Sequence, residues 1–255
     1  MSAPNTGESA PMAEVTAVRL GDKWVTTAND LTRAAHRLTL GEKRLIAACI
    51  AQVKSDSPLP ATTDRTRKTY TVTAAEYAEL YDVSRDTAYE QMRANQKTLW
   101  AKEIQTIKPN GKEGRKVRWV QEIAYNDGEA SVTLMWSDAV CQVLFNLSEQ
   151  FTTYKLKHAA RFTTKYAWTL FEMLAMWRKA GRFSMDVDTF RDKLEVSATA
   201  RANYKELRVR VIEPSLREIR EKCGIVVTVE ERKRGRRVAE LAFSWEPDPQ
   251  GTLAF

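Results

Sequence analysis

The stretch that decides the fold is TAAEYAELYDVS, from Thr73 to Ser84, because DVDTFRDKLEVS, from Asp186 to Ser197, repeats its pattern. Thr73 and Glu76 form a capping box that starts a helix, and Ser84 can cap a second helix directly after a tight turn. The aligned positions are Tyr77 with Phe190, Tyr81 with Leu194, Val83 with Val196 and Ser84 with Ser197. The sequence therefore predicts a helix-turn-helix that occurs twice.

Alternating apolar residues follow both predicted helix pairs. In the first copy they run from Val117 to Tyr125, between the turn signals at 109–111 and 126–128. In the second copy they form the strands Val226–Glu231 and Val238–Trp245, around a basic turn. Because a helix-turn-helix followed by a β-hairpin is a winged helix, we expect an α+β fold of two tandem winged-helix domains related by internal duplication.

This pattern divides the chain into four expected parts. They are a flexible N-terminal tail (1–22), an N-terminal winged-helix domain (23–136), a C-terminal winged-helix domain (137–246) and a C-terminal tail (247–255). Leu45–Val53 has one apolar face and is expected to fill the N-terminal core. The last long helix, from Asn203 to about Lys222, should bend or break near Pro214.

Positive charge is concentrated in the second part of the chain. The 255 residues carry a net charge of +7, and residues 155–255 contain 21 Lys and Arg against 14 Asp and Glu. Residues 1–154 are balanced, with 19 of each sign. A basic half beside a neutral half favours a nucleic-acid-binding module joined to one with another task, although a merely basic soluble protein has the same composition.

Several classes of protein are disfavoured. The longest apolar run, Leu45–Val53, is about half of what a membrane span needs, and the N-terminus lacks a signal-peptide pattern, so a cytoplasmic protein is expected. Cys49, Cys141 and Cys223 lie far apart in apolar surroundings, which favours reduced, buried thiols. His36 and His158 stand alone, so we expect no metal and no other cofactor.

The same absences argue against an enzyme. The sequence has no P-loop and no nucleophile elbow. A DNA-nicking enzyme would pair a tyrosine nucleophile with a histidine-ligated metal, and two histidines so far apart are a poor fit. We therefore expect no catalytic residues.

The start of the last long helix carries the candidates for reading DNA bases, because the N-terminal part of the second helix of a helix-turn-helix enters the major groove. Asn203, Lys205 and Arg208 are the base-reading candidates, and Arg201 and Arg210 are expected to contact phosphates. A solvated helix with ion pairs such as Glu206–Arg210 is the alternative reading of these charges.

The basic turn follows this helix at the spacing of a wing. Gly235 permits a tight turn, and the cations around it would lie on neighbouring phosphates or in the minor groove. These cations are Arg232, Lys233, Arg234, Arg236 and Arg237. A solvated surface turn would look similar. Auxiliary phosphate contacts are expected from the first helix-turn-helix and its wing, at Arg85, Arg93, Lys97, Lys112, Arg115 and Lys116.

Five segments in a fixed order resemble the plasmid replication initiators that bind iterons, the Rep proteins with two winged-helix domains. The segments are ANDLTRAAHRLTLGEKRLI, YTVTAAEYAELYDVSRDTAYEQM, FTTKYAWTLFEML, LRVRVIEPSLREI and RKRGRRVAELAFSW. The resemblance covers residues 23–245 and places the family's arginine-rich helix start on Arg208 and Arg210, with Val209 where some relatives have a basic residue.

The resemblance implies binding to double-stranded DNA in two modes. A monomer would bind direct repeats at the plasmid origin, chiefly through the C-terminal domain. A homodimer formed through the N-terminal domain would bind an inverted repeat in the operator and repress the protein's own gene. Host DnaA, the replicative helicase and chaperones are the further partners it implies. The alternative is a dimeric winged-helix repressor with no origin function.

Overall fold

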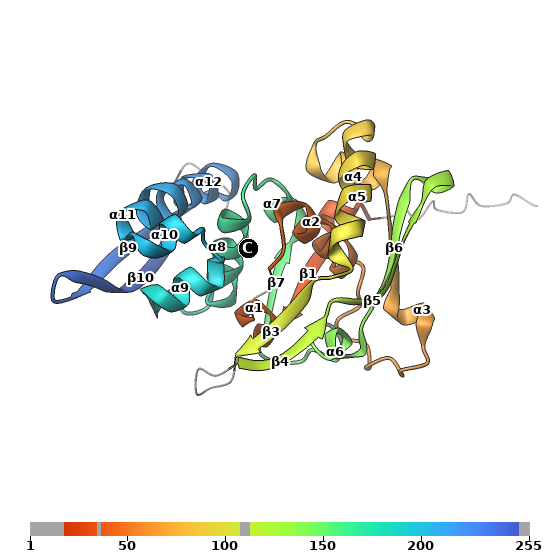
Figure 1. The fold of residues 1–255 in the computed structure, drawn as a ribbon, viewed down its shortest axis with the longest axis horizontal. Helices are drawn as coiled ribbons and strands as arrows, with labels where there is room; N and C mark the ends of the chain where they lie inside the picture. The colour runs from red at the N-terminus through yellow and green to blue at the C-terminus, as the bar shows by residue number, and fades with distance from the viewer. Residues whose placement is uncertain (1–17, 35–36, 108–112, 250–255) are drawn as a thin grey trace, which may run out of the picture.

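The structure is a computed structural model that describes residues 18–34, 37–107 and 113–249. Two winged helices lie end to end along the long axis of the molecule (Figure 1). The helices are η1 (Leu20–Asp22), α1 (Asn29–Arg33), α2 (Leu40–Ile50), α3 (Arg65–Lys68), α4 (Ala74–Tyr81), α5 (Arg85–Leu99), η2 (Asp127–Glu129), α6 (Asp138–Cys141), α7 (Leu156–Ala160), α8 (Lys165–Met176), α9 (Val187–Leu194), α10 (Ala198–Ala202), α11 (Tyr204–Leu207), η3 (Arg208–Ile212) and α12 (Glu213–Cys223).

The strands form four small antiparallel sheets. They are β1 (Trp24–Ala28) with β7 (Phe151–Lys155), β3 (Glu103–Ile107) with β4 (Glu113–Arg118), β2 (Thr69–Thr73) with β6 (Ser131–Trp136) and β5 (Val120–Asn126), and β8 (Arg182–Asp186) with β10 (Arg237–Pro247) and β9 (Ile225–Arg234). The two three-stranded sheets have the orders β2-β6-β5 and β8-β10-β9, so the strand that comes last in each copy occupies the centre of its sheet.

The internal duplication is confirmed by element order. One copy runs α2-β2-α4-α5-β5-β6, and the other runs α8-β8-α9, then α10 to α12, then β9-β10. Both copies cap the first helix of the turn with a side chain, Thr73 in α4 and Asp186 in α9. Both end that helix with a left-handed residue, Asp82 at φ 50° and Glu195 at φ 50°, and a serine then caps the next helix. The repeated local pattern therefore sets the same backbone path twice.

The first wing lies at different residues from those predicted. By sheet order, the counterpart of the β9–β10 hairpin is β5–β6, with its tip at η2. The β3–β4 hairpin is inserted between α5 and β5 and has no counterpart in the second copy. The alternation from Val117 to Tyr125 therefore does not form one strand, because it is shared between β4 and β5.

One strand pair crosses the predicted limits of the N-terminal domain. β7 lies beyond the expected boundary at residue 136 and yet pairs with β1 from Trp24–Lys155 to Ala28–Phe151. Leu20, placed in the expected tail, is buried, and Asp22 of η1 pairs with Lys157 at 2.8 Å. A strand that follows α6 therefore completes the sheet that begins with β1, and η1 packs against the rest of the protein.

One hydrophobic core runs through both copies. Helix α8 lies between them and packs against β7 on one side and α12 on the other. Leu45, Ile46, Cys49 and Ile50 of α2 are buried, as expected of a helix that fills the core. All three cysteines are buried free thiols, and burial raises the pKa of Cys141 to about 11.

Candidate DNA-binding surface

The second helix-turn-helix begins its recognition segment with two short helices. Ser197 caps α10, and Asn203 ends α10 and caps α11, because its side-chain oxygen accepts a hydrogen bond from the Lys205 amide at 2.9 Å. This capping bond uses the oxygen with which Asn203 would read adenine. Lys205 is exposed on α11, and Arg201 is exposed on α10, where it pairs with Asp192 at 2.6 Å.

The helix changes its winding at the predicted arginines. The segment η3 is π-helical, and Pro214 follows directly in the first turn of α12. Because proline has no N–H to donate to the carbonyl of residue 210, the regular α-helical bonding cannot continue there. The expected interruption near Pro214 is confirmed. Arg208, Val209 and Arg210 are all exposed on this segment, and 51% of Val209 is accessible.

Carboxylates contact both arginines of the π-helical segment. Arg208 Nε lies 2.8 Å from Glu213, and its Nη1 lies 3.2 Å from Glu231 on β9. Arg210 pairs with Glu206 at 2.5 Å. Sequence reasoning found the second pair from its i,i+4 spacing but missed both partners of Arg208. Glu213 is five residues away, and Glu231 belongs to another element.

The predicted second wing is confirmed as a hairpin. Arg234 pairs with Arg237 in the register, so Gly235 and Arg236 form a two-residue loop, and Gly235 has φ 64°. A positive φ at the first loop position explains the glycine, because other residues rarely adopt it. Lys233, Arg234, Arg236 and Arg237 are exposed. Arg232 forms ion pairs with Glu230 and Glu240, each at 3.4 Å.

The auxiliary candidates separate into two elements. Arg85, Arg93 and Lys97 are exposed on α5, the second helix of the first helix-turn-helix. Arg93 is already engaged, by Asp127 at 3.9 Å and by the ring of Tyr125. Arg115 and Lys116 are exposed on β4 of the inserted hairpin, which corrects their expected place in the wing, and Lys112 lies outside the described residues.

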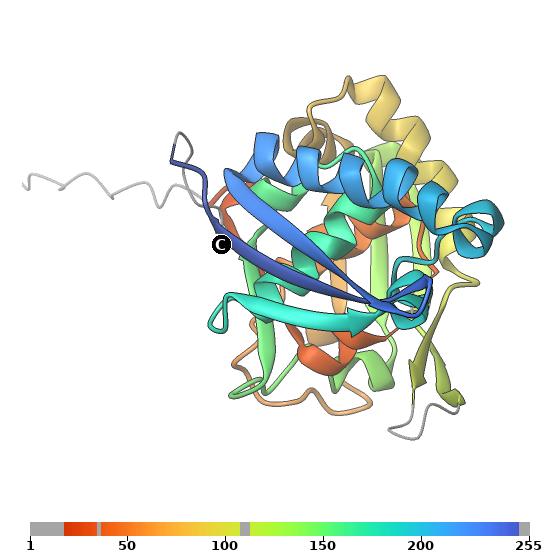
Figure 2. The same ribbon diagram turned by 90° about the vertical axis from the view of Figure 1, so that its left-hand side faces the viewer.

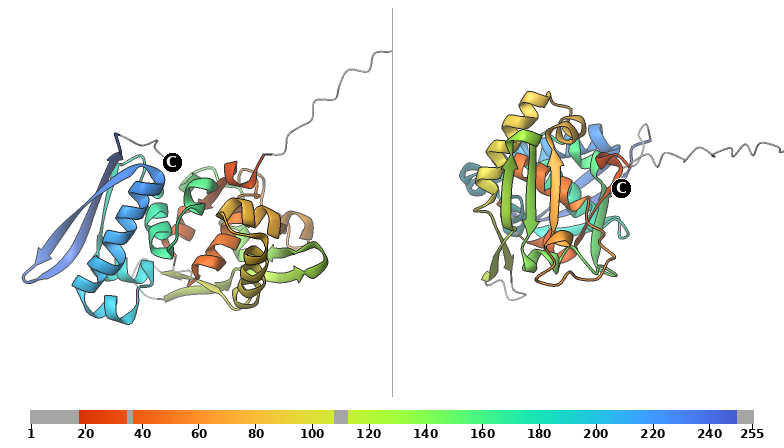
Figure 3. Two further views of the ribbon diagram at one scale, coloured as in Figure 1. Left: turned by 90° about the horizontal axis from the view of Figure 1, so that it is seen from above. Right: turned by 90° about the vertical axis from the view of Figure 1, so that its right-hand side faces the viewer.

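These elements share one side of the molecule. Helix α5, the β3–β4 hairpin, helix α10 and the tip of the β9–β10 wing all lie on the right-hand side in Figure 2 and along the lower edge in the left panel of Figure 3. The second helices of both helix-turn-helix units therefore lie on the same side of the molecule as the inserted hairpin.

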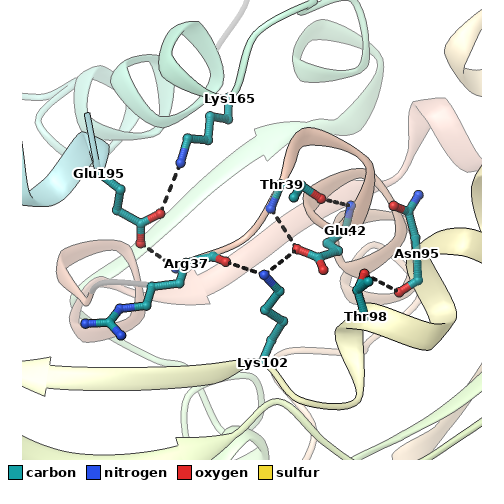
Figure 4. A network of polar contacts seen from close by, with 8 residues as sticks. All are labelled: Arg37, Thr39, Glu42, Asn95, Thr98, Lys102, Lys165 and Glu195. Carbon is teal, nitrogen blue, oxygen red and sulfur yellow. Dashed lines mark hydrogen bonds and ion pairs between the residues drawn. The ribbon is translucent and has the colours of Figure 1, made fainter. Parts of the chain in front are cut away.

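A polar network ties the second helix-turn-helix to the N-terminal domain (Figure 4). Glu195, in the turn itself, accepts a hydrogen bond from the backbone of Arg37 and pairs with Lys165 at 3.3 Å. Lys102 donates to the Arg37 carbonyl at 3.0 Å and pairs with buried Glu42 at 3.3 Å. Sequence reasoning missed this junction, because its members are far apart in the chain and carry no local pattern.

The described residues contain no cluster of three or more His, Cys, Asp or Glu side chains placed to hold a metal ion. His158 lies on α7, where burial lowers its pKa, and His36 lies outside the described residues. In the same part of the chain, every helix is too short or too polar to span a bilayer.

The fold and this surface define a tandem winged-helix protein. Residues 24–175 match the family model described as "Initiator Replication protein, WH1", and residues 186–245 match "Initiator Rep protein, WH2". The chain belongs to this family of replication initiator (Rep) proteins. The WH1 match includes α8, which agrees with the packing of this helix against the N-terminal domain.

Individual relatives agree with this assignment. The chain is 25% identical to an Escherichia coli "Replication initiation protein" over 231 residues, 89% of this chain and 70% of the relative. It is 23% identical to an E. coli "Uncharacterized 27.6 kDa protein" over 207 residues, 79% of this chain and 87% of the relative. The crystal structure of Pi initiator protein in complex with iteron DNA is similar, with a TM-score of 0.75 and 20% identity over 90% of this chain and 99% of that one.

Proposed function

We propose that this protein initiates plasmid replication by binding direct repeats, the iterons, at a plasmid origin. The observation that carries the proposal is the placement of both recognition helices and the second wing on one side of a molecule with a single core. A protein built in this way presents two different DNA-binding elements to one repeat. This suits a monomer on a direct repeat, which has no two-fold symmetry.

In this proposal Lys205 and Arg208 read base edges, and Arg201 and Arg210 bind phosphates. The wing cations Lys233, Arg234, Arg236 and Arg237 bind the backbone or the minor groove beside them. Helix α5 and the inserted β3–β4 hairpin bind phosphates on the adjacent part of the repeat. Asn203 contributes by capping α11, which fixes the start of the recognition segment. Binding and remodelling of DNA require no catalytic residue, so the proposed role is non-enzymatic.

The wider proposal includes a second assembly state. A homodimer would bind an inverted repeat and repress the protein's own gene, while host DnaA, the replicative helicase and chaperones would act with the monomer at the origin. A protein with these partners would work in the bacterial cytoplasm. A repressor without origin function would use the same fold on a palindrome alone.

Footprinting tests the proposal. Separated monomer and dimer fractions would be footprinted on the DNA that flanks the coding region. We expect the monomer to protect tandem direct repeats, each about two helical turns long, beside an A+T-rich stretch. Protection of a single inverted repeat, by the dimer only, would favour the repressor and overturn the initiator.

A further inference from the structure

Two carboxylates from two different elements contact the guanidinium of Arg208. Its guanidinium contacts Glu213 from the same helix, at 2.8 Å, and Glu231 from the wing strand β9, at 3.2 Å. Glu231 and Glu213 are 26% and 46% exposed, so both carboxylates lie at the surface beside Arg208, which is 54% exposed. A side chain held from two elements has one orientation relative to the helix and the wing together.

The π-helical segment is what permits the first of these contacts. In a regular α-helix, a residue five positions further on has turned about 140° away, so Glu213 could not face Arg208. In a π-helix, residues five apart lie on the same side. Pro214, which lacks the N–H for the regular bond to residue 210, lies just after this winding, and the pair between Arg208 and Glu213 spans it.

The second contact lies next to Tyr204. The ring of Tyr204 is half-buried, and its hydroxyl is buried beside Glu231. Burial, and next the neighbouring Glu231 carboxylate, raise the pKa of Tyr204, so the hydroxyl beside this carboxylate stays neutral at ordinary pH.

We propose that Glu213 and Glu231 are positioning residues for sequence recognition, which hold Arg208 in the orientation that reads a base. This inference rests on the proposed DNA-binding function. The two contacts engage Nε and Nη1 and leave three of the five guanidinium N–H groups, enough for the two donors that guanine O6 and N7 accept. The carboxylates repel phosphates, so they weaken binding in general while they sharpen it for the right sequence.

The opposite signs of these two effects give the test. Full-length wild type, Glu213→Gln and Glu231→Gln would be titrated with a duplex that the protein selects from a random pool, and with a scrambled duplex of equal composition. Glu221→Gln is the matched control, since Glu221 is an exposed carboxylate on α12. We expect all three variants to bind the scrambled duplex more tightly. Only the first two should lose discrimination, by roughly tenfold, within the range of one base contact.

Two further measurements separate the possible outcomes. Thermal midpoints equal to wild type would show that the Gln variants keep the fold. The double variant should lose no more discrimination than Arg208→Ala, because all three changes act through one guanidinium. Unchanged discrimination in both Gln variants, with a loss in Arg208→Ala, would overturn the positioning role alone. Unchanged discrimination in Arg208→Ala would overturn it too. A wild type without discrimination would instead overturn the proposed function.

Discussion

Arg208 offers the most direct test of the proposed base recognition. Replacing it with alanine should cost about 1–3 kcal/mol of binding free energy and relax the preference at one base pair, because a two-donor contact to guanine would be lost. Affinity for every single-base variant of the bound repeat measures this. Arg217→Ala, at an exposed position of α12, should change binding by less than about 0.5 kcal/mol. Equal weakening on all sequences would make Arg208 a phosphate contact.

Lys43 shows how much a single buried charge contributes to the core. It pairs with Glu172 of α8 at 2.6 Å, and the side chains are only 8% and 16% exposed. Lys43→Met should lower the free energy of unfolding by about 3–5 kcal/mol, because Glu172 keeps a buried charge without its partner. Arg65→Met breaks an exposed pair with Glu122 and should cost at most about 1 kcal/mol. Urea denaturation measures both, and equal losses would contradict the expectation.

At the scale of elements, the wing should determine how binding responds to salt. Arg234→Gln with Arg236→Gln should reduce the slope of log affinity against log salt by about two units, because each phosphate contact releases about 0.9 counterion. The matched control is Lys179→Gln with Arg182→Gln. Arg182 of β8 lies opposite Ser244 in the strand register, at the other end of the sheet from the wing tip. A slope that stays unchanged in the wing variant would show that the wing does not reach DNA.

The elements that sequence could predict are those encoded locally. Capping residues and apolar spacing were enough for α4, α5, α8 and α9, and turn residues around Gly235 were enough for the second wing. Pro214 was enough to predict the break in the last long helix, although the π-helical winding of residues 208–212 has no distinct sequence signal.

Pairings between distant segments could not be predicted in this way. The β1–β7 pair joins strands more than a hundred residues apart, and no local pattern in either strand indicates its partner. The β3–β4 hairpin carries the same alternation as a wing strand, and only sheet order distinguishes the two. The contacts of Glu231 with Arg208 and of Glu195 with Arg37 depend on tertiary structure alone.

At the scale of the whole molecule, Lys193 should make the junction between the domains sensitive to pH. It donates to the Ala34 carbonyl at 2.7 Å, and burial lowers its pKa to about 7 from an ordinary 10.5. The charged groups around it are Glu172, Lys43, Glu195 and Arg33. Because the folded pKa is the lower one, the unfolded chain binds more protons between pH 7 and 10.5, and stability should rise with pH across that window.

Comparison of wild type with Lys193→Met isolates this effect. The free energy of unfolding, measured in urea at pH 7 and at pH 9, should rise more in wild type than in the variant. The difference should be at most about 1.4 kcal/mol per pH unit, the limit for one proton. Equal changes in the two proteins would show that the Lys193 ammonium is not destabilised at the junction.

The shared core around α8 has a consequence for the DNA as well. If this core fixes the separation of α5 and α11, both helices can enter the major groove together only when their two sites have one rotational phase on the duplex. Inserting about five base pairs into the middle of a repeat, half a turn, would move the two major grooves to opposite sides. Gel-shift titration should then show only the affinity of the protein for one half of the repeat. Inserting about ten base pairs should restore the rotational phase of the two grooves but not the distance between them. A repeat that tolerates both insertions would mean that the two halves bind independently.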